Sequence, residues 1–353
     1  MEMQTGVLPA VEEIEFGKHF GPNLVLADYR RGKWSDLRIE PLRAIELHPA
    51  AVVLHYAQAV FEGLKAFRHP NGQVVLFRPE LNARRFSESA RRLLLPEIDV
   101  PVFLQAMTDA VTSNVAYVPP KPGSLYLRPT LIACGPGLSV HASEEALLFV
   151  LTSPAGSYFR QARGADSTIN VFVDESMARA ARGGTGRVKT GANYAVTLQS
   201  IDQAKKKGCA QVLYLDACGH RQIEEMGGMN IFFASDGRLI TPALGGTILP
   251  GVMRASVIEA ADALGIRVEE RAITIDEIVE GCRSGNITEA FACGTAATVV
   301  GIRELLLESG LCLHLSGSPG PLTRQFFDYI HEIQYGLRPD PHGWVVPVDS
   351  HAH

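Results

Sequence analysis

Apolar and polar positions in the first half of the chain predict both strands and helices. Four apolar residues open segment 24–29 and a Gly-Lys-Trp turn follows, a pattern typical of a strand entering a hairpin. Prolines begin two helical segments, which we expect over residues 79–95 and 101–117, and prolines also stand just beyond their ends. β-rich runs at 125–133 and 146–151 flank a Gly-Pro-Gly turn. This half therefore predicts an α+β domain.

The second half alternates strand and helix patterns. Prolines, glycines and few aliphatic residues in segment 153–166 suit a connection between domains. Apolar runs then predict strands at 168–173, 211–215, 229–233, 267–271 and 287–292. Helical patterns occupy residues 193–207 and follow Pro250-Gly251 and Asp276.

These patterns predict the fold class α/β (α+β), with two mixed α/β domains and a ligand cleft between them. We expect a smaller N-terminal domain over residues 1–156, a connection at 157–166 and a larger C-terminal domain over 167–353. A chain of 353 residues is long enough for two such cores.

Composition narrows the possible partners. Hydrophobic residues make up 46% and charged residues 20%, which excludes wholesale disorder. A net charge of −5 argues against a nucleic-acid or membrane surface as the main partner. The longest apolar run, 146–151, is far shorter than the roughly 20 residues of a membrane helix. The acidic N-terminal segment lacks a signal-peptide pattern, so we expect a cytoplasmic protein.

Cysteine and histidine spacing indicates no metal and no disulfide framework. The six cysteines are scattered without a Cys-x-x-Cys motif, as in reduced intracellular proteins. The eleven histidines form no His-Glu-x-x-His motif. We therefore expect neither a structural nor a catalytic metal ion.

The densest candidate for chemistry is the Gly-rich segment 179–194, which contains Lys189. A Walker A motif needs glycine directly before its lysine, and Val188 stands there instead. The G-x-G-x-x-G dinucleotide pattern fails as well. A lysine among apolar and small residues can become a nucleophile or form a Schiff base. On this segment alone, a solvated loop lysine remains the more common interpretation.

Three further segments support a chemical role for Lys189. Residues 224–230 place a carboxylate beside a Gly-Gly turn that precedes an apolar strand. Residues 244–251 offer backbone N–H groups directly before a helix, an arrangement that cradles phosphate. Residues 292–297 form a tight turn with little side-chain bulk. Each segment taken singly is typical of a structural turn.

Together these motifs resemble the branched-chain aminotransferases, which belong to the fold type IV group of pyridoxal-phosphate enzymes. About four-fifths of the chain follows the order of that family's motifs. The matching segments are His55-Tyr56, Phe61-Glu-Gly-Leu-Lys-Ala-Phe67, Phe77-Arg-Pro-Glu-Leu-Asn82, Tyr126-Leu-Arg-Pro129, Lys189-Thr-Gly-Ala-Asn-Tyr194, the Glu225 turn, Gly294-Thr-Ala296 and Glu332-Ile-Gln-Tyr-Gly336.

The resemblance implies pyridoxal 5′-phosphate as cofactor and assigns roles around it. Lys189 would be the Schiff-base lysine of the C-terminal domain and would then shuttle a proton. Glu225 would pair with the pyridine nitrogen and keep it protonated, and Tyr194 would hydrogen-bond the phenolic oxygen. The phosphate would be met by side chains or backbone N–H groups of Arg85, Arg179, Thr247, Ile248 and Thr295.

The resemblance also implies a substrate pocket that accepts both an apolar side chain and a second carboxylate. Arg128 would receive the side-chain carboxylate of glutamate. Tyr56, contributed across a dimer interface, would help the Thr295-Ala296 backbone to hold the α-carboxylate. The walls of the pocket would be Phe61, Tyr126 and Tyr158.

The implied activity is a ping-pong transamination of L-leucine, L-isoleucine and L-valine with 2-oxoglutarate, which gives branched-chain 2-oxo acids and L-glutamate. The enzyme would serve branched-chain amino-acid biosynthesis as a cytoplasmic homodimer. Alternatives on the same fold are D-amino-acid transamination and aminodeoxychorismate lysis, against which Arg128 and the aromatic pocket argue. A non-catalytic phosphate-ligand-binding protein is a further alternative, and Lys65 is the rival lysine.

Overall fold

The computed structural model describes residues 8–156, 164–315 and 317–348. Its chain divides into two compact units, each of which mixes helices and strands. The first unit comprises Met1–Tyr158, Val188–Gly191 and Glu332–His353, and the second comprises Phe159–Arg187 and Ala192–His331. The segment around Lys189 therefore groups with the first unit. The domain limits expected at 156 and 167 stay a prediction, and most of the expected connection, 157–163, lies outside the described residues.

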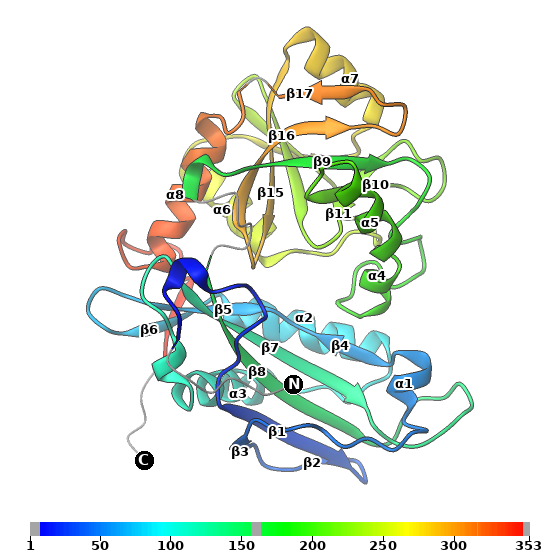
Figure 1. The fold of residues 1–353 in the computed structure, drawn as a ribbon, viewed down its shortest axis with the longest axis vertical. Helices are drawn as coiled ribbons and strands as arrows, with labels where there is room; N and C mark the ends of the chain where they lie inside the picture. Colours follow the sequence, from blue (N-terminus) through cyan, green and yellow to red (C-terminus); the bar gives the residue numbers. More distant parts are fainter. Residues whose placement is uncertain (1–7, 157–163, 316, 349–353) are drawn as a thin grey trace. The chain divides into compact units, whose positions relative to one another are not determined.

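The first unit is built on a nine-stranded sheet (Figure 1). The strand order is β18-β6-β5-β7-β8-β1-β2, with β3 added beside β1 and β4 beside β7, and every pairing is antiparallel. The strands are β1 (Asn23–Arg30), β2 (Lys33–Trp34), β3 (Arg38–Pro41), β4 (Ala59–Phe61), β5 (Leu64–Arg68), β6 (Val74–Phe77), β7 (Ser124–Ala133), β8 (Ala146–Ala155) and β18 (Val345–Pro347).

Helices cover the core of the first unit. α2 (Pro79–Arg92) and α3 (Val100–Thr112) pack against each other, α3 also lies against β1, β7 and β8, and α1 (Val52–Tyr56) lies beside β7. α2 begins with proline at its first position and buries one face that includes Phe86. Phe86 meets Phe103 of α3 at a ring-centroid distance of 5.3 Å. This packing fixes α2 and the polar side chains that it carries beside the sheet.

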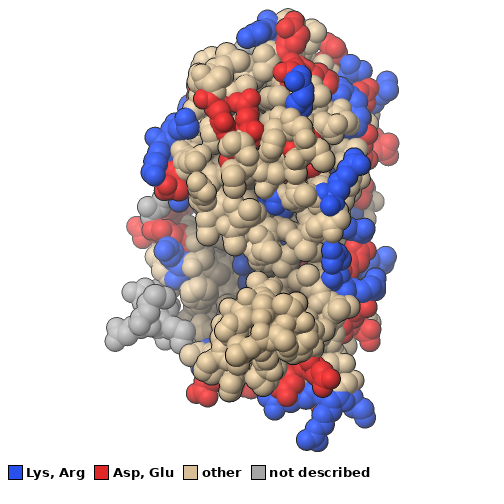
Figure 2. All heavy atoms as spheres, turned by 90° about the vertical axis from the view of Figure 1, so that its right-hand side faces the viewer, with Lys and Arg blue, Asp and Glu red and all other residues tan. Residues whose placement is uncertain are grey.

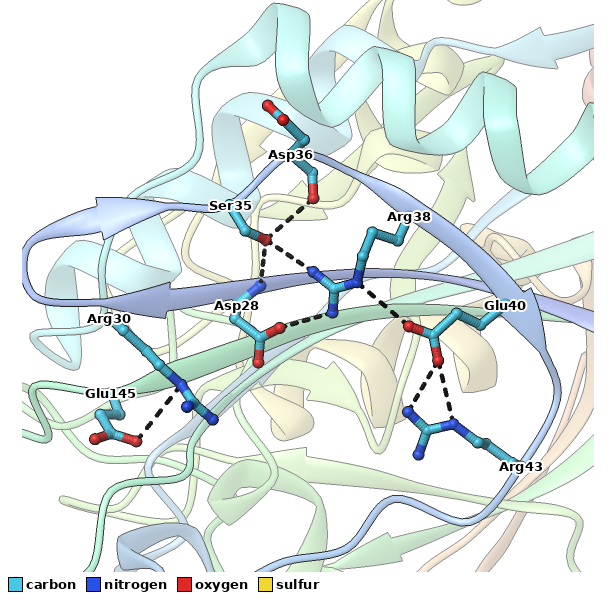
Figure 3. Close-up of polar contacts among 8 residues, drawn as sticks. All are labelled: Asp28, Arg30, Ser35, Asp36, Arg38, Glu40, Arg43 and Glu145. Carbon is cyan, nitrogen blue, oxygen red and sulfur yellow. Dashed lines mark hydrogen bonds and ion pairs between the residues drawn. The ribbon is translucent and has the colours of Figure 1, made fainter.

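The outer strands β1 and β3 carry a polar network on their exposed side (Figure 3). Arg38 lies at its centre and contacts Asp28 at 2.6 Å and Glu40 at 3.3 Å, while Arg43 contacts Glu40 at 2.9 Å. The hydrogen bond to Asp28 raises the pKa of Arg38. Hydrogen bonds from Arg43, and next from Arg38, lower the pKa of Glu40. Partly exposed pairs of this kind contribute little to stability, but opposite charges on neighbouring strands favour this register.

The second unit also contains a nine-stranded sheet, with both parallel and antiparallel pairings. Its order is β11-β10-β9-β16-β15-β12-β13-β14, and β17 is added beside β16. The strands are β9 (Thr168–Asp174), β10 (Gln211–Leu215), β11 (Ile223–Met226), β12 (Asn230–Ser235), β13 (Arg238–Pro242), β14 (Val268–Arg271), β15 (Ile287–Gly294), β16 (Thr298–Leu306) and β17 (Cys312–His314).

Helices of the second unit pack on its sheet. α5 lies against β9 and β10, α6 against β14 and β15, and α7 against β15 and β17. The N-cap of α7 is Thr274, whose hydroxyl accepts a hydrogen bond from the Glu277 amide. The helices are α4 (Ala192–Ala195), α5 (Leu198–Lys206), α6 (Val252–Ala263), α7 (Ile275–Ser284) and α8 (Pro321–Gln334), whose last three residues belong to the first unit.

The sequence pattern overestimates three helices. The segment expected as one helix over 193–207 is split into α4 and α5, because the Thr197 hydroxyl donates to the Tyr194 carbonyl and competes with helical bonding. α2 ends at Arg92 because Leu94 adopts a left-handed backbone with φ of 54°. α3 ends at Thr112, and only a short 3₁₀ turn continues the chain to Tyr117.

Two observations concern membrane-spanning helices and the state of the cysteines. No helix in the part of the chain that the structure describes is long and apolar enough to cross a membrane. All six cysteines fall within the described residues, and each is a free thiol.

Candidate functional site

In the first unit, the segment that carries Lys189 is pinned to the sheet and to α2. The Lys189 carbonyl accepts a hydrogen bond from the Phe61 amide at 3.0 Å, and the Lys189 amide donates to the Ser89 hydroxyl at 3.0 Å. Next to it, Thr190 bridges to Val60 and its hydroxyl donates to the Ala59 carbonyl at 2.8 Å. The backbone of Lys189 is thus fixed at the edge of β4. The position of its side chain then depends on the side chains that pack around it.

The Lys189 amine lies over the face of Phe61. Its Nζ is 4.9 Å from the ring centroid, within the range of a cation–π contact. The guanidinium carbon of Arg128 lies 4.8 Å from the same ring centroid and 5.2 Å from that of Tyr126. Arg128 also donates to the Tyr126 hydroxyl at 3.0 Å. Four of the predicted site residues are therefore brought together on one aromatic surface of the first unit.

Gly63 shows how tightly this surface is built. A Cβ atom at position 63 would lie 2.0 Å from the Tyr126 hydroxyl oxygen. Only glycine lets the chain after β4 approach Tyr126 so closely. The glycine of the Phe61-Glu-Gly motif is thus required by the position of Tyr126.

Arg85, expected to meet a phosphate, forms a buried ion pair with Glu62. Its Nε and Nη2 atoms donate to the two carboxylate oxygens of Glu62 at 2.6 and 2.9 Å, and Asn82 donates to the same carboxylate at 2.7 Å. Glu62 is fully buried. Burial by itself raises the pKa of Glu62, but the Arg85 guanidinium outweighs this effect and holds that pKa below its usual value; Lys189 acts in the same direction.

The remaining predicted residues of the first unit lie elsewhere. Tyr56 is exposed at the end of α1, and its hydroxyl donates to the Leu138 carbonyl at 2.5 Å. Tyr158, predicted to line the substrate pocket, lies outside the described residues.

In the second unit, Glu225 is the centre of a buried polar cluster. The carboxylate at the end of β11 is ion-paired with Arg179. It also accepts hydrogen bonds from the Leu249 amide at 3.0 Å and from the Asn230 side chain at 3.2 Å. Asn230 in turn donates to the Leu249 carbonyl at 3.1 Å. These donors stabilise the ionised form of the carboxylate.

Arg179 also ties two loops of the second unit together. Its Nη2 atom donates to the Gly186 carbonyl at 3.1 Å and to the Thr247 carbonyl at 2.5 Å. A Cβ atom at position 186 would lie 2.4 Å from the Thr247 carbonyl oxygen, so only glycine allows this approach. The predicted phosphate residues Thr247 and Ile248 are buried in the loop that leads into α6.

The other predicted residues of the second unit occupy two places. Tyr194 lies in α4, and a Cβ atom on Gly228 would approach its ring at 3.8 Å, so the ring lies beside the turn that follows Glu225. Thr295 and Ala296 form the half-buried turn between β15 and β16. The structure thus gathers Arg179, Tyr194, Glu225 and Thr247 around the β11–β12 turn and the neighbouring loops.

The donor set of the second unit fits pyridoxal phosphate. A carboxylate that contacts Arg179, Asn230 and a backbone amide suits a protonated ring nitrogen. The Nε atom of Arg179 is buried and has no hydrogen-bond partner among the described residues, and such a donor favours an anionic ligand. In the first unit, the Lys189 backbone is fixed by two hydrogen bonds and its amine lies over the Phe61 ring, which holds the amine in one place.

Sequence reasoning assigned no role to two residues that organise these clusters. Glu62 holds Arg85 across 23 positions, and Asn230 holds Glu225 across five. Neither spacing is a recognised motif. Glu62 carried one signal, since an acidic residue between apolar strand residues needs a partner when the strand is buried.

The chain is similar to known proteins over most of its length. The amino-transferase class IV family matches residues 59–305. A branched-chain-amino-acid aminotransferase from Mycolicibacterium smegmatis is 42% identical over 341 residues, which cover 95% of this chain and 92% of that protein.

Solved structures agree with this match. The branched-chain amino acid aminotransferase of Thermobaculum terrenum in its PLP form has a TM-score of 0.75 and 27% identity, with 94% of this chain and 99% of that chain covered. The Escherichia coli enzyme has a TM-score of 0.77 at 24% identity, covering 93% and 100% of the two chains, and supports the fold. The predicted fold class, resemblance and cofactor are confirmed, and the alternative activities on this fold are not favoured.

The buried Glu62–Arg85 pair gives a stability prediction. Glu62→Gln leaves the Arg85 cation buried without its counter-ion, so we expect a loss of about 3–5 kcal/mol at neutral pH. The folded-state pKa of Glu62 is lowered from its ordinary value of 4.5, so the stabilisation is present above that pH and is lost as the pH falls through the folded-state pKa. The unfolding midpoint of the wild type should therefore fall more steeply with acidification than that of Glu62→Gln.

The matched control is Glu40→Gln, which removes a carboxylate from the partly exposed network of Figure 3 and should change the midpoint far less than Glu62→Gln. Equal midpoints for Glu62→Gln and the wild type at pH 7 would contradict the assignment.

Proposed function

Because the chain belongs to the amino-transferase class IV family and, within it, to the branched-chain-amino-acid aminotransferases, we propose that it moves the amino group of L-leucine, L-isoleucine or L-valine to 2-oxoglutarate. It is an enzyme that uses pyridoxal phosphate. The single observation that carries the proposal at residue level is the aromatic surface on which Lys189 and Arg128 lie together. The reaction would alternate two half-reactions, in which a branched-chain donor leaves as its 2-oxo acid before 2-oxoglutarate enters.

Lys189 would be the catalytic residue. When bound, the cofactor supplies a conjugated ring that accepts the electron pair released at the substrate Cα. The Nζ atom of Lys189 would first hold the cofactor and then, once the substrate amine has displaced it, take the proton from Cα. Its fixed backbone at the edge of β4 returns the amine to the same place in each cycle.

In the second unit, Glu225 would hold the proton on the pyridine nitrogen, and Arg179 with Asn230 would hold Glu225. The phosphate would be bound by two side chains, those of Arg85 and Arg179, the latter through its Nε atom. Backbone N–H groups at Thr247, Ile248 and Thr295 would complete its shell, and Tyr194 would hydrogen-bond the phenolic oxygen. Arg85 would bind the phosphate while paired with Glu62, which keeps its guanidinium in one orientation.

Substrate selection would depend on Phe61, Tyr126 and Arg128. The aromatic faces suit the side chains of leucine, isoleucine and valine. The guanidinium of Arg128 suits the second carboxylate of glutamate, and its Nε atom is buried with no hydrogen-bond partner among the described residues. Tyr56, Tyr158 and the Ala296 backbone would complete the substrate contacts.

We also propose a cytoplasmic homodimer. Free thiols at all six cysteines suit a reducing compartment. An apolar patch supports self-association. It consists of the exposed side chains of Leu54 and Tyr56 on α1 and of Leu138 and Val140 on the β7–β8 connection. The two parts of the patch are adjacent, because the Gly137 amide in that connection donates to the Ala50 carbonyl just before α1. Figure 2 faces the side on which Figure 1 draws α1 and shows a broad uncharged surface low in the view.

The first test concerns the identity of the reactive lysine. Lys189→Met should abolish the visible band of the lysine-bound cofactor and lower transamination by at least about 10²–10⁴-fold, because the proton-transfer group is lost. The control is Lys65→Met, which removes the rival lysine, whose pKa burial lowers to about 8.

Lys65→Met should keep the band and its bleaching by L-leucine, as recorded by absorption spectroscopy. A band that persists in Lys189→Met and disappears in Lys65→Met would transfer the role to Lys65. A band that bleaches with a D-amino acid but not with L-leucine would overturn the proposed substrate.

A second test separates the two substrate classes. Arg128→Met should raise the KM for 2-oxoglutarate by about 10–100-fold and leave the half-reaction with L-leucine nearly unchanged, because only the dicarboxylate needs the guanidinium. Arg128→Lys keeps the charge but not the planar pair of donors, so an intermediate KM is expected. Equal losses with both substrates would contradict selective recognition by Arg128.

A third test addresses the homodimer. The double substitution Leu138→Asp with Val140→Asp introduces two charges into the apolar patch, so we expect the mass in light scattering to fall from two chains to one. Val102→Asp, at an exposed position on α3, is the control and should leave the mass unchanged. A single-chain mass for the unaltered protein at micromolar concentration would refute the homodimer.

A further inference from the structure

Three side chains that commonly bind metal ions share one face of the β16–β17 hairpin in the second unit. Glu304 of β16 is directly opposite His314 of β17, and Cys312 is opposite Leu306. Because side chains on a strand alternate between its two faces, Glu304, Cys312 and His314 point to the same side. Their candidate ligand atoms all lie within 4.8 Å of one another. We call these three residues the hairpin triad.

The chemistry of the hairpin triad suits one class of ion. A thiolate, an imidazole and a carboxylate are the donors that zinc prefers, whereas magnesium and calcium select oxygen alone. The distance from His314 Nδ1 to Glu304 Oε1 is 3.3 Å. Two ligands placed about 2.0–2.1 Å from zinc at a tetrahedral angle are separated by about that distance. We propose that the hairpin triad binds a divalent transition-metal ion of the zinc class, with water as the fourth ligand.

The sheet holds the three ligands in place. Leu305 and Leu313 lie between them in sequence, point to the opposite face and are buried in the core of the second unit. The turn that joins the strands is closed by two backbone hydrogen bonds: the Leu307 amide donates to the Leu311 carbonyl at 2.9 Å, and the Gly310 amide donates to the Leu307 carbonyl at 3.0 Å. A rigid register keeps ligands on neighbouring strands at a fixed separation, which lowers the entropic cost of binding.

Glu304 brings a negative charge to the hairpin triad, which favours a cation there. Arg303, whose Nε is 4.0 Å from Glu304, supplies part of the balancing positive charge at present and donates to Asn170 at 3.1 Å.

The proposed ion is separate from the transamination chemistry. Glu304 lies six positions beyond Thr298, where β16 begins after the turn that contains Ala296, and this corresponds to about 20 Å along the strand. The ion would therefore stabilise the hairpin rather than take part in the reaction. This inference does not rest on the proposed function, and either can fail without the other.

Cobalt(II) is the probe for the test. The full-length, cofactor-loaded enzyme is freed of metal with a chelator and titrated with cobalt. We expect one equivalent to produce the intense visible bands of tetrahedral cobalt, at wavelengths beyond the cofactor band, and zinc to abolish them. Cys312→Ser should remove the sulfur-to-cobalt band, and Glu304→Gln or His314→Gln should weaken binding at least about tenfold.

Cys218→Ser is the matched control, because Cys218 is an exposed thiol outside the triad and its loss should leave the spectrum unchanged. Saturating zinc should also raise the unfolding midpoint of the wild type but not that of Cys312→Ser. Retained transamination of L-leucine shows that each variant is folded.

Two results would overturn the proposal. One is the absence of tetrahedral cobalt bands in the wild type at millimolar metal. The other is a spectrum that is unchanged in Cys312→Ser. In either case Glu304 and His314 form a cross-strand polar contact and nothing more.

Discussion

A fully buried carboxylate, Glu62, organises the first unit. Burying such a charge is costly unless cations and hydrogen-bond donors surround it. Here the cation is Arg85 of α2 and the further donors are Asn82 of α2 and the Gly63 amide. Glu62 directly follows Phe61, whose amide fixes the Lys189 backbone. The charge therefore connects the helix, the strand and the lysine segment, so that displacing one of them would leave a buried ion unpaired.

The second unit uses the same device with Glu225 and Arg179. Both arginines expected to meet a phosphate are ion-paired with buried glutamates. This pairing is compatible with phosphate binding, since a guanidinium has five N–H donors and a carboxylate occupies two of them at most. A glutamate partner keeps each arginine ordered, so that less side-chain entropy is lost when an anion arrives. On the proposed function, the two pairs would thus prepare each unit for a charged ligand.

Local sequence patterns predicted the regular elements well but not the long-range contacts. The strand expected at 211–215 matches β10, because its apolar run ends at clear turn residues. The helix expected at 193–207 is broken, because a threonine hydroxyl competes with the backbone. Short strands such as β17 carry too few residues for a pattern to show.

The residues of the candidate sites likewise fall into those that local sequence indicated and those that it did not. The Lys189 and Glu225 segments were visible because glycine turns flank them, whereas Glu62 and Asn230 were not assigned a role because their partners depend on the fold. The hairpin triad was not predicted from the sequence, because its ligands are divided between two strands. Cys312 and His314 are two residues apart, and Glu304 joins them only through the antiparallel register. Motif spacing led to the expectation of no metal, whereas register supports the opposite proposal.

The contacts of Arg128 with Phe61 and Tyr126 suggest how one pocket would serve two unlike side chains. A guanidinium that lies over aromatic rings still offers N–H donors to a carboxylate and leaves the rest of the aromatic surface apolar. An aliphatic side chain would contact that surface without displacing the cation. A carboxylate would approach the edge without meeting a hydrophobic wall. On the proposed function, the choice between leucine and glutamate then requires no rearrangement of the pocket, only a different part of the same aromatic surface.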